Sequence, residues 1–423
     1  MSTPTVRLLT LNTWGLKYIS KFRNERLRAI ANRLADEHEK YDVVALQEVW
    51  VEEDWEYIVK MCKEFFPYLR KFSAGVVSGP GLAILSKIPI ESTFLYRFPI
   101  NGRPSAFWRG DWFVGKSVAV TLLQPVEDNV HPLAILNSHM HAPYARTGDA
   151  AYECHRSCQA WDFAKLSNLL SRSGYAVVIV GDLNSRPGSL PHKFLTLETT
   201  LIDSWEQLNG VQDLKRIAAL SPSLQVEIGG TTCDSLLNTW RSHCQPDEAC
   251  RLDYALIDAS KTKTIDAKVV FTEQVEGFGS YSDHFGYSCT LQILRKDFYR
   301  QLHRSNSLTV NRVAYYNEML DLIDSYKKIA QWQKNWRCAH FLLSLTIVVG
   351  IHVATTFTSN VAGWSSVFWV FSSTVIGITG TVNGIIGFIF GNYELRALDE
   401  VRMEVEDTKA SISTINLNYL KMN

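Results

Sequence analysis

The sequence predicts an α+β fold with four layers, mixed β-sheets with helices outside them, followed by a C-terminal hairpin of two transmembrane helices. Residues 5–295 alternate short apolar runs with amphipathic segments and show no strict strand–helix–strand repeat. Two stretches without a full charge, about 338–359 and 364–390, are each long enough to cross a hydrocarbon layer of about 30 Å. The 423 residues are 46% hydrophobic and 20% charged, which allows a large buried core.

Strands are predicted where aliphatic and β-branched residues run together between glycine or polar boundaries. These runs are VRLLTLN, DVVALQEV, GLAILSK, SVAVTLL, LAILNSHMH, AVVIVGDL, LDYALID and YSCTLQIL. Apolar residues at helical spacing predict helices over 22–38, about 54–66 and 151–173.

The charge balance disfavours nucleic-acid binding, and the cysteine content indicates the compartment of the protein. The chain holds 43 Lys plus Arg and 43 Asp plus Glu, whereas proteins that grip nucleic acid usually carry a basic excess. The segment MSTPTVRLLTLNTWG lacks the apolar core of a signal peptide, the 8 cysteines are scattered, and no Asn-x-Ser/Thr sequon occurs. We therefore expect most of the chain to face a reducing cytosol. Cys154 and Cys158, with His155 between them, are expected to be buried thiols rather than a metal site.

The composition changes after about residue 296, where an amphipathic segment over 310–332 precedes the apolar stretches. Lys and Arg flank the hairpin but are absent from its loop, which by the positive-inside rule places both chain ends in the cytosol. The predicted division is a folded domain over 1–295, a linker with a juxtamembrane helix over 296–336, two spans over 337–391, and a cytosolic C-terminal helix over 392–423.

The hairpin sequence predicts how its helices pack. Asn383 and His340 are expected at similar depth and are expected to pair, because lone polar groups in lipid are costly. After residue 395 a short heptad seam is expected to pack on the 310–332 helix or on a second copy. Glycines three and four residues apart allow close helix approach, within the hairpin or in a homodimer: Gly377, Gly380, Gly384, Gly387 and Gly391.

Polar side chains follow the ends of several predicted strands. One such residue alone would indicate a turn, but a set of carboxylates, amides and histidines is what metal-assisted phosphoryl chemistry needs. A carboxylate holds a hard cation, amides position oxygens, and a histidine takes up a proton near neutral pH. His141, on the strand face of His139, is expected to support the set. Its members are Asn12, Glu48, His139, Asp182, Asn184, Asp253, Asp283 and His284.

These strand ends lie in motifs with a family likeness. LNTWG, LQEVW, SHMHA, GDLNSRP and SDH occur in the order used by the endonuclease/exonuclease/phosphatase superfamily, whose fold is a DNase I-like α/β/β/α sandwich. GDWFVGK and the C-terminal hairpin resemble the neutral sphingomyelinases. From about residue 6 to 415 the chain resembles the fungal inositol phosphosphingolipid phospholipases C, through FPINGRPSAFWRGDWFVGK, SHMHAPYA, CHRSCQAWDF, GDLNSRPGSLPHKFL and TTCDSLLNTW.

The resemblance implies an Mg²⁺-dependent phospholipase C, with Mn²⁺ as a substitute, that releases ceramide and a phosphorylated headgroup from a membrane sphingolipid. It implies an integral membrane protein with a cytosolic catalytic domain, in the endoplasmic reticulum or alternatively a mitochondrial membrane. In this comparison Glu48 with Asn12 binds the metal, and Asp283 helps to fix the metal shell.

The same resemblance assigns roles around the phosphodiester. It makes His284 the general base and Asp253 the residue that orients His284. Asn184 and His139 would hold the phosphoryl oxygens. Asp182 would orient water or the leaving oxygen, and the division of roles between Asp182 and His284 stays open.

A loop around DWFVG carries a second group of candidates. The loop has two possible roles. Its glycine amides with a lysine could bind a phosphate, or its acid and lysine could form a surface salt bridge. The residues concerned are Gly110, Asp111, Gly115 and Lys116. The resemblance links the acid and the lysine to substrate engagement and to activation by an anionic phospholipid: phosphatidylserine, cardiolipin or phosphatidylglycerol. Nearby rings are expected to dip into the headgroup layer and nearby arginines to meet anionic lipid: Phe107, Trp108, Trp112, Phe113, Arg103 and Arg109.

Other functions stay open at this stage. One is a neutral sphingomyelinase that prefers phosphocholine, and another is an inositol polyphosphate phosphatase or nuclease of the same fold. Neither a soluble inositol phosphate nor DNA requires two membrane spans, and we expect no nucleic-acid partner. A membrane scaffold without chemistry is disfavoured by the complete set of acid, amide and histidine positions.

Overall fold

The computed structural model describes residues 4–297 and 306–422, with side chains described over 4–297 and 312–412. The chain divides into two compact units. The first, here called the sheet unit, comprises Met1–Gly102 and Arg109–Leu308. The second, here called the helical unit, comprises Arg103–Trp108 and Thr309–Asn423.

The first six-stranded sheet of the sheet unit has the order β11-β14-β1-β2-β4-β3. β1 and β2 run parallel, and β14 runs antiparallel to β1. Its strands are β1 (Thr5–Asn12), β2 (Val43–Gln47), β3 (Tyr68–Lys71), β4 (Ala83–Ser86), β11 (Thr262–Val270) and β14 (Gly286–Ile293).

The second six-stranded sheet has the order β5-β6-β7-β8-β10-β9. β7 and β8 run parallel, and β10 runs antiparallel to β8. Its strands are β5 (Ile90–Arg97), β6 (Ser117–Leu123), β7 (Leu133–His139), β8 (Ala176–Asp182), β9 (Leu201–Asp203) and β10 (Asp253–Asp258), and a separate ladder joins β12 (Gln274–Val275) to β13 (Gly279–Ser280).

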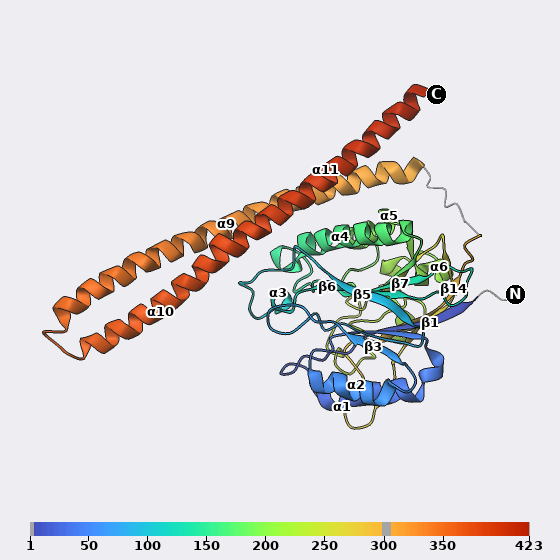
Figure 1. The fold of residues 1–423 in the computed structure, drawn as a ribbon, viewed down its shortest axis with the longest axis horizontal. Helices are drawn as coiled ribbons and strands as arrows, with labels where there is room; N and C mark the ends of the chain where they lie inside the picture. Colours follow the sequence, from blue (N-terminus) through green and yellow to red (C-terminus); the bar gives the residue numbers. More distant parts are fainter. Residues whose placement is uncertain (1–3, 298–305, 423) are drawn as a thin grey trace. The chain divides into compact units, whose positions relative to one another are not determined.

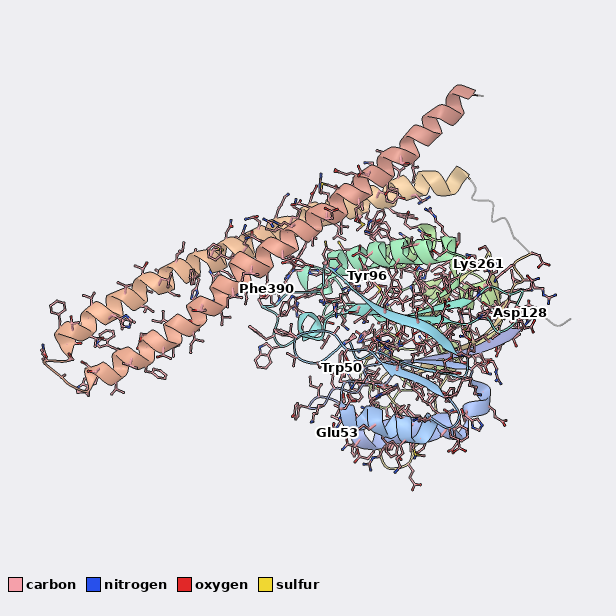
Figure 2. The ribbon with its side chains drawn as sticks, viewed as in Figure 1. Trp50, Glu53, Tyr96, Asp128, Lys261 and Phe390 are labelled. Carbon is pink, nitrogen blue, oxygen red and sulfur yellow. The ribbon has the colours of Figure 1, made fainter. Side chains whose placement is uncertain are left out.

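Helices cover the outer faces of the two sheets, so the sheet unit has the predicted four layers (Figure 1). α1 (Arg23–Asp36) and α2 (Glu52–Cys62) bury an apolar cluster against the first sheet, and α4 (Glu153–Arg172) and α5 (Leu190–Leu197) lie beyond the second. An apolar cluster joins the inner faces of both sheets, through residues such as Leu8 and Val178. Side chains fill the space between the sheet ribbons (Figure 2). Shorter helices occupy the connections: α3 (Asp111–Val114), α6 (Ser204–Asn209), α7 (Leu214–Ala218) and α8 (Pro222–Glu227).

The helical unit is formed by α9 (Asn306–Thr358), α10 (Ser365–Ile385), a π-helical segment (Ile386–Phe390) and α11 (Gly391–Met422). Two helices are long and apolar enough to cross a membrane, within Arg312–Thr358 and Ser365–Ile412. The predicted juxtamembrane helix and first span are one uninterrupted helix, α9. Residues 298–305 of the predicted linker lie outside the described residues.

Small residues bring α9 and α10 into close contact. A Cβ atom on Gly380 would lie 2.4 Å from Cβ of Ser344, and one on Gly384 would lie 2.7 Å from Cδ2 of Phe341. The predicted pairing is confirmed, since Nδ2 of Asn383 lies 3.2 Å from Nδ1 of His340. The glycine face therefore serves packing within the hairpin.

Along α11, ion pairs hold the helix against α9. Arg402 Nε lies 3.0 Å from Asp324 Oδ1, and Lys327 pairs with Asp399. Leu398 of the predicted seam is fully buried. Of the two partners proposed for the seam, the 310–332 helix is the one it packs on, and a homodimer through either surface stays a prediction.

Candidate active site

Strand directions bring the predicted polar residues to one edge of each sheet. Asn12 ends β1 and Glu48 follows β2, and these strands are parallel. His139 ends β7 and Asp182 ends the parallel strand β8, where the two residues are direct neighbours in register. Because parallel strands end at the same edge, these side chains gather outside the carboxyl ends of the strands.

Antiparallel strands bring the remaining residues to the same edge from their amino ends. Asp253 begins β10 and lies opposite Asp182 in register. Asp283 and His284 precede β14, which is antiparallel to β1. A strand that runs back must start where its neighbour ends, so residues far apart in sequence meet.

The gathered side chains line a cavity of about 370 Å³ in the sheet unit. Asp253 does not line the cavity and stands behind His284. Trp50, labelled in Figure 2, contributes to the wall next to Glu48. The predicted residues on the wall are Asn12, Glu48, His139, Asp182, Asn184, Asp283, His284, Arg109, Gly110, Asp111 and Lys116.

Asp182 is the centre of the hydrogen-bond network. Asn12 Nδ2 donates to Asp182 Oδ2 and to Glu48 Oε1, both at 3.1 Å. His139 Nε2 lies 3.5 Å and His284 Nε2 lies 3.8 Å from the same Asp182 oxygen. Burial and the charge of Asp253 raise the pKa of Asp182 to about 7, so the carboxyl titrates near neutrality.

His284 is held by the carboxylate behind it. Its Nδ1 lies 2.8 Å from Asp253 Oδ2, and Asp253 is fully buried. Burial lowers the pKa of His284, but the charges of Asp253 and Asp182 outweigh burial and hold that pKa well above its ordinary value. The pair leaves Nε2 as the nitrogen that faces Asp182.

Four non-glycine wall residues adopt backbone conformations that side chains rarely take: Trp14, Glu48, Asn184 and Asp234. Glu48 has φ 61° and Asn184 has φ 47°, each just after a buried strand. Such conformations cost about 1–3 kcal/mol each and cluster at functional sites. Asn184 is fixed further, because its backbone N–H donates to Asp182 Oδ1 and its Nδ2 donates to Met140 O, both at 3.0 Å.

The glycine that precedes Asp182 in GDLNS, Gly181, is required by the packing of two strands. Its φ is 126°, and a Cβ atom there would lie 1.9 Å from the carbonyl oxygen of Ser138 on the neighbouring strand. Only glycine lets β7 and β8 approach so closely, and that approach sets Asp182 beside His139.

The donor set fits a divalent cation. Burial and the charge of Asp283 raise the pKa of Glu48, which indicates negative charge that its neighbours do not offset. One ligand atom each from Asp182, Asp253 and His284 lie within 4.8 Å of one another. Oδ1 of Asp253 is buried and has no hydrogen-bond partner within the described chain. Carboxylate oxygens are the ligands that hard cations prefer.

The predicted metal ligands have additional partners in this structure. Asn12 turns its amide nitrogen toward Glu48 and accepts from the N–H of Trp14 at 3.0 Å with its oxygen. Asp283 Oδ2 lies 2.5 Å from Nη2 of Arg241. The assignment of Glu48, Asn12 and Asp283 to a metal stays a prediction.

Three neighbours of the site were not among the sequence candidates. Arg241 holds Asp283, Cys233 Sγ lies 3.5 Å from His284 Nε2, and the Ser282 hydroxyl donates to Asn12 O at 2.6 Å. None of the three follows an apolar strand, so the strand-end pattern does not reveal them. Ser282 stands beside the SDH motif, which is the one signal that would have suggested it.

Asp111 and Lys116 form a buried pair on the cavity wall, not a surface salt bridge. Lys116 Nζ lies 3.1 Å from Asp111 Oδ1, and their side chains are 3% and 5% exposed. Burial raises the pKa of Asp111. The charges of Lys116 and His141 and the hydrogen bond from Tyr144 together outweigh burial and bring that pKa to about 2. Gly110 and Gly115 bound α3 with φ 78° and φ 70°, so the glycines shape this turn.

His141 lies against this pair, and its expected support of the strand-end set stays a prediction. Its Nε2 lies 3.8 Å from Asp111 Oδ2, and its ring stacks on Tyr152 with centroids 4.1 Å apart. Burial lowers the pKa of His141 to about 3, so the imidazole is neutral at physiological pH.

The residues predicted for the membrane interface differ in exposure. Trp108 is 100% and Phe107 is 57% exposed, whereas Trp112 and Phe113 are half-buried and pack edge to face. Arg103 is buried, with its Nε 2.8 Å from Tyr326 Oη within the helical unit. Arg109 is half-buried, with its guanidinium 5.0 Å from the Tyr144 ring centroid. Contact of these residues with lipid stays a prediction.

Comparison with known proteins adds family relationships. Residues 9–284 match the Endonuclease/Exonuclease/phosphatase family. The chain is 55% identical to "Inositol phosphosphingolipids phospholipase C" of Saccharomyces cerevisiae, over 97% of this chain and 91% of that protein. It is 36% identical to the protein of that name in Schizosaccharomyces pombe, over 96% and 95%.

A more distant similarity links the chain to an animal enzyme. "Sphingomyelin phosphodiesterase 2" of Mus musculus is 34% identical over 49% of this chain and 49% of the mouse protein. The family match spans the strand ends from Asn12 to His284 that line the cavity. The chain therefore belongs to the Endonuclease/Exonuclease/phosphatase family and, within it, to the group of these fungal phospholipase C relatives.

Proposed function

We propose that the protein is a phospholipase C that hydrolyses the phosphodiester of inositol phosphosphingolipids and releases ceramide and a phosphorylated headgroup. The observation that carries this proposal is the His284–Asp253 pair facing Asp182 in a cavity lined by every other member of the strand-end set. The identity to the two fungal relatives over nearly their whole length supports the substrate class.

Proton transfer is assigned to the buried pair. Asp253 accepts from Nδ1 of His284, which leaves Nε2 as the atom that takes a proton from the attacking water when the ring is neutral. A cation in the acidic cluster would favour the neutral ring, because it would oppose the carboxylate charges that raise the pKa of His284. Asp182, whose pKa is about 7, lies 3.8 Å from that nitrogen and orients the water or shares its proton.

Fixed hydrogen-bond donors would stabilise the negative charge that develops on the phosphoryl oxygens during the reaction. Burial and the charge of Lys116 hold the pKa of His139 well below its ordinary value, so His139 is a neutral imidazole. Its Nδ1 is buried without a hydrogen-bond partner among the described residues and lies 4.0 Å from Glu48 Oε1. Asn184 and Lys116 lie on the same wall.

A bound Mg²⁺, or Mn²⁺ as a substitute, would supply charge stabilisation for the phosphoryl oxygens in this acidic cluster. Glu48 and Asn12 would hold the ion, and Asp283, tied to Arg241, would keep its shell in place. The raised pKa of Glu48 supports this assignment, because a cation would restore the charged carboxylate.

The two apolar helices support a membrane anchor. A substrate with two long chains leaves a bilayer only at high cost, and anchoring raises the effective concentration of enzyme at the lipid surface. We propose a cytosolic sheet unit on an endoplasmic reticulum membrane, with a mitochondrial membrane as the alternative. Trp108 and Phe107 would insert into the headgroup layer, and an anionic phospholipid would activate the enzyme.

A headgroup-release assay tests the proposal. The purified chain in mixed micelles, with phosphatidylserine and MgCl₂, should release labelled headgroup from inositol phosphoceramide and, as a second substrate class, from sphingomyelin. It should release nothing from abasic DNA or a soluble inositol polyphosphate. The proposal fails if neither sphingolipid is cleaved.

A further inference from the structure

A second cavity opens beside the catalytic one in the sheet unit. Its volume is about 520 Å³. It shares part of its wall with the catalytic cavity, including Asn184, which is assigned to the substrate phosphate. The reaction assigned above uses nothing else in it. Shared wall residues are Pro143, Tyr144, Asn184, Asp234 and Leu252.

Arg156 of α4 reaches this cavity with an incompletely bonded guanidinium. The residue is 9% exposed. Its Nη1 donates to the carbonyl oxygen of Ala151, whereas Nε is buried without a hydrogen-bond partner. Within the described residues, Nη2 has no partner either, and no carboxylate forms an ion pair with this side chain. Burial of an unpaired guanidinium is costly, so a ligand group is expected to complete it.

Other buried arginines of the sheet unit have more partners than Arg156, although Nε of Arg251 is also buried without one. Arg26 donates to the carbonyl oxygens of Thr13, Trp14, Lys21 and Tyr281. Arg251 pairs with Asp203 at 2.7 Å and with Glu206 at 3.4 Å. Among the described residues, Arg156 differs from Arg251 because no carboxylate pairs with it, and from Arg26 because its guanidinium donates to a single carbonyl oxygen.

A second unpartnered polar atom lies on the same wall. Ser185 follows Asn184 directly, is 2% exposed, and its Oγ has no hydrogen-bond partner in the described part of the chain. Arg156 and Ser185 both line this cavity, and each has one buried polar atom without a hydrogen-bond partner. Native proteins leave few such groups, which makes their coincidence at one cavity informative.

Arg186 adds an exposed donor at this wall. It donates to the backbone oxygens of Asp247 and Glu248, at 3.3 and 2.7 Å, and keeps its charge unpaired with any carboxylate in the described residues. Arg146, in contrast, is neutralised by the carboxylates of the same two residues, at 3.0 and 3.2 Å.

The chemistry of the wall fits a polyol. Guanidinium groups donate, the carboxylate of Glu153 accepts, and the Ser185 hydroxyl does both, which matches ring hydroxyls that both donate and accept. Among the described residues on this wall, Tyr144 is the one aromatic ring. Quaternary ammonium groups are typically bound by several aromatic rings, so phosphocholine fits poorly.

We propose that this cavity is the headgroup subsite and that it binds a polyhydroxylated ring joined to the phosphate, with Arg156 and Ser185 as the groups that contact the ring. This inference rests on the proposed phospholipase C function. It assigns the preference for phosphoinositol over phosphocholine to Arg156, through hydrogen bonds from a charged donor to ring oxygens.

Calorimetric titration tests the inference without turnover. Full-length protein in detergent with MgCl₂ is titrated with myo-inositol 1-phosphate, phosphocholine and inorganic phosphate. The wild type should bind inositol phosphate about tenfold or more tightly than phosphocholine, since a hydrogen bond to a charged group contributes about that factor. Arg156→Met should remove this difference while phosphate binding persists, and Arg156→Lys should restore part of it. Arg172→Met, at the far end of α4 and off the cavity wall, is the matched control.

The outcomes separate the two proposals. The headgroup inference is overturned if the wild type shows no preference, or if Arg156→Met weakens all three ligands equally or none. If Arg156→Met does not fold, as judged by circular dichroism, Ser185→Ala provides the test and should reduce the preference by a smaller factor. Absence of headgroup release from every sphingolipid would instead contradict the proposed function, whatever the titration shows.

Discussion

Nδ1 of His284 lies 2.8 Å from Oδ2 of Asp253, a carboxylate that has no exposed surface. The contact joins His284, two residues before β14 of one sheet, to the first residue of β10 in the other. It fixes the imidazole ring so that Nε2 points toward Asp182. The assignment of the general base depends on this contact.

Removing the base should abolish most turnover. His284→Ala should lower kcat for inositol phosphoceramide by about 10²- to 10⁴-fold, the usual contribution of a general base. Asp253→Asn should lower kcat with little change in KM, because it disturbs the ring rather than the substrate. Vesicle binding should be unchanged in both variants, and His243→Ala, an exposed histidine, is the control. Full activity in His284→Ala would exclude the assignment.

The Mg²⁺ dependence of the activity should require the carboxylate of Glu48. EDTA should abolish headgroup release, and MgCl₂ should restore it. Glu48→Gln removes the charge but keeps the hydrogen bond from Asn12, so the Mg²⁺ concentration at half-maximal activity should rise by about tenfold or more. An unchanged Mg²⁺ requirement in Glu48→Gln would mean that other carboxylates hold the ion.

Asp111 should make stability depend on acid pH. Its pKa falls from an ordinary value of 3.8 to about 2 in the folded protein. A depressed carboxyl pKa stabilises the fold above the unfolded value, and this contribution is lost as pH falls through the folded value. The shift corresponds to about 2 kcal/mol.

Chemical denaturation monitored by tryptophan fluorescence measures this effect. Between about pH 5 and about pH 2 the wild type should lose about 2 kcal/mol more stability than Asp111→Asn. The substitution also leaves Lys116 buried without its partner, so Asp111→Asn should be destabilised at neutral pH and less so with Lys116→Met added. Parallel pH profiles of the wild type and Asp111→Asn would contradict the prediction.

Trp108 should contribute to membrane binding. Its side chain is fully exposed, and interfacial tryptophans are stabilised at the headgroup layer. Trp108→Ser should weaken activity on vesicles while activity on a short-chain soluble substrate persists. Phe94→Ser, which removes a ring that is 40% exposed on β5, is the control. Equal loss on both substrates would place Trp108 in folding or catalysis instead.

The hairpin offers an internally matched test of helix packing. Gly384→Leu should lower the unfolding temperature of the detergent-solubilised protein, because a Cβ there already meets Phe341 at 2.7 Å. At Gly377 nothing lies within 4 Å, so Gly377→Leu should leave that temperature unchanged. Dissociation of a dimer by Gly377→Leu, measured by light scattering, would show that this open position contacts a second copy.

The sequence predicted the interior of both sheets but missed their margins. Each of the eight predicted runs lies in an interior strand: β1, β2, β4, β6, β7, β8, β10 or β14. In the two six-stranded sheets, the four strands without a prediction are the edges: β3, β5, β9 and β11. Interior strands are buried on both faces and are read as continuous apolar runs, whereas β5 alternates exposed and half-buried residues and β9 spans 3 residues.

The residues of the candidate site also fall into two groups, those that the sequence predicted and those that it did not. The residue types at Asn12, Glu48, Asp182 and His284 were readable because each follows or precedes a buried run. Pairing of Asn383 with His340 was readable too, because helix length fixes depth in a hairpin. Arg156 and Ser185 carried no such signal, since their meaning depends on which polar atoms remain without partners.

What the sequence alone determined was local: which segments bury their backbone, and which polar residues stand where buried strands stop. Strand direction and sheet order, decided only in the tertiary structure, placed Asp253 behind His284 and put Arg156 at a cavity beside the catalytic one. The physical reason is that a buried strand appears in the sequence as a continuous run of apolar residues, which can be recognised without the fold. Hydrogen-bond completion is a property of neighbours far apart in sequence, so it becomes visible only when the chain is folded.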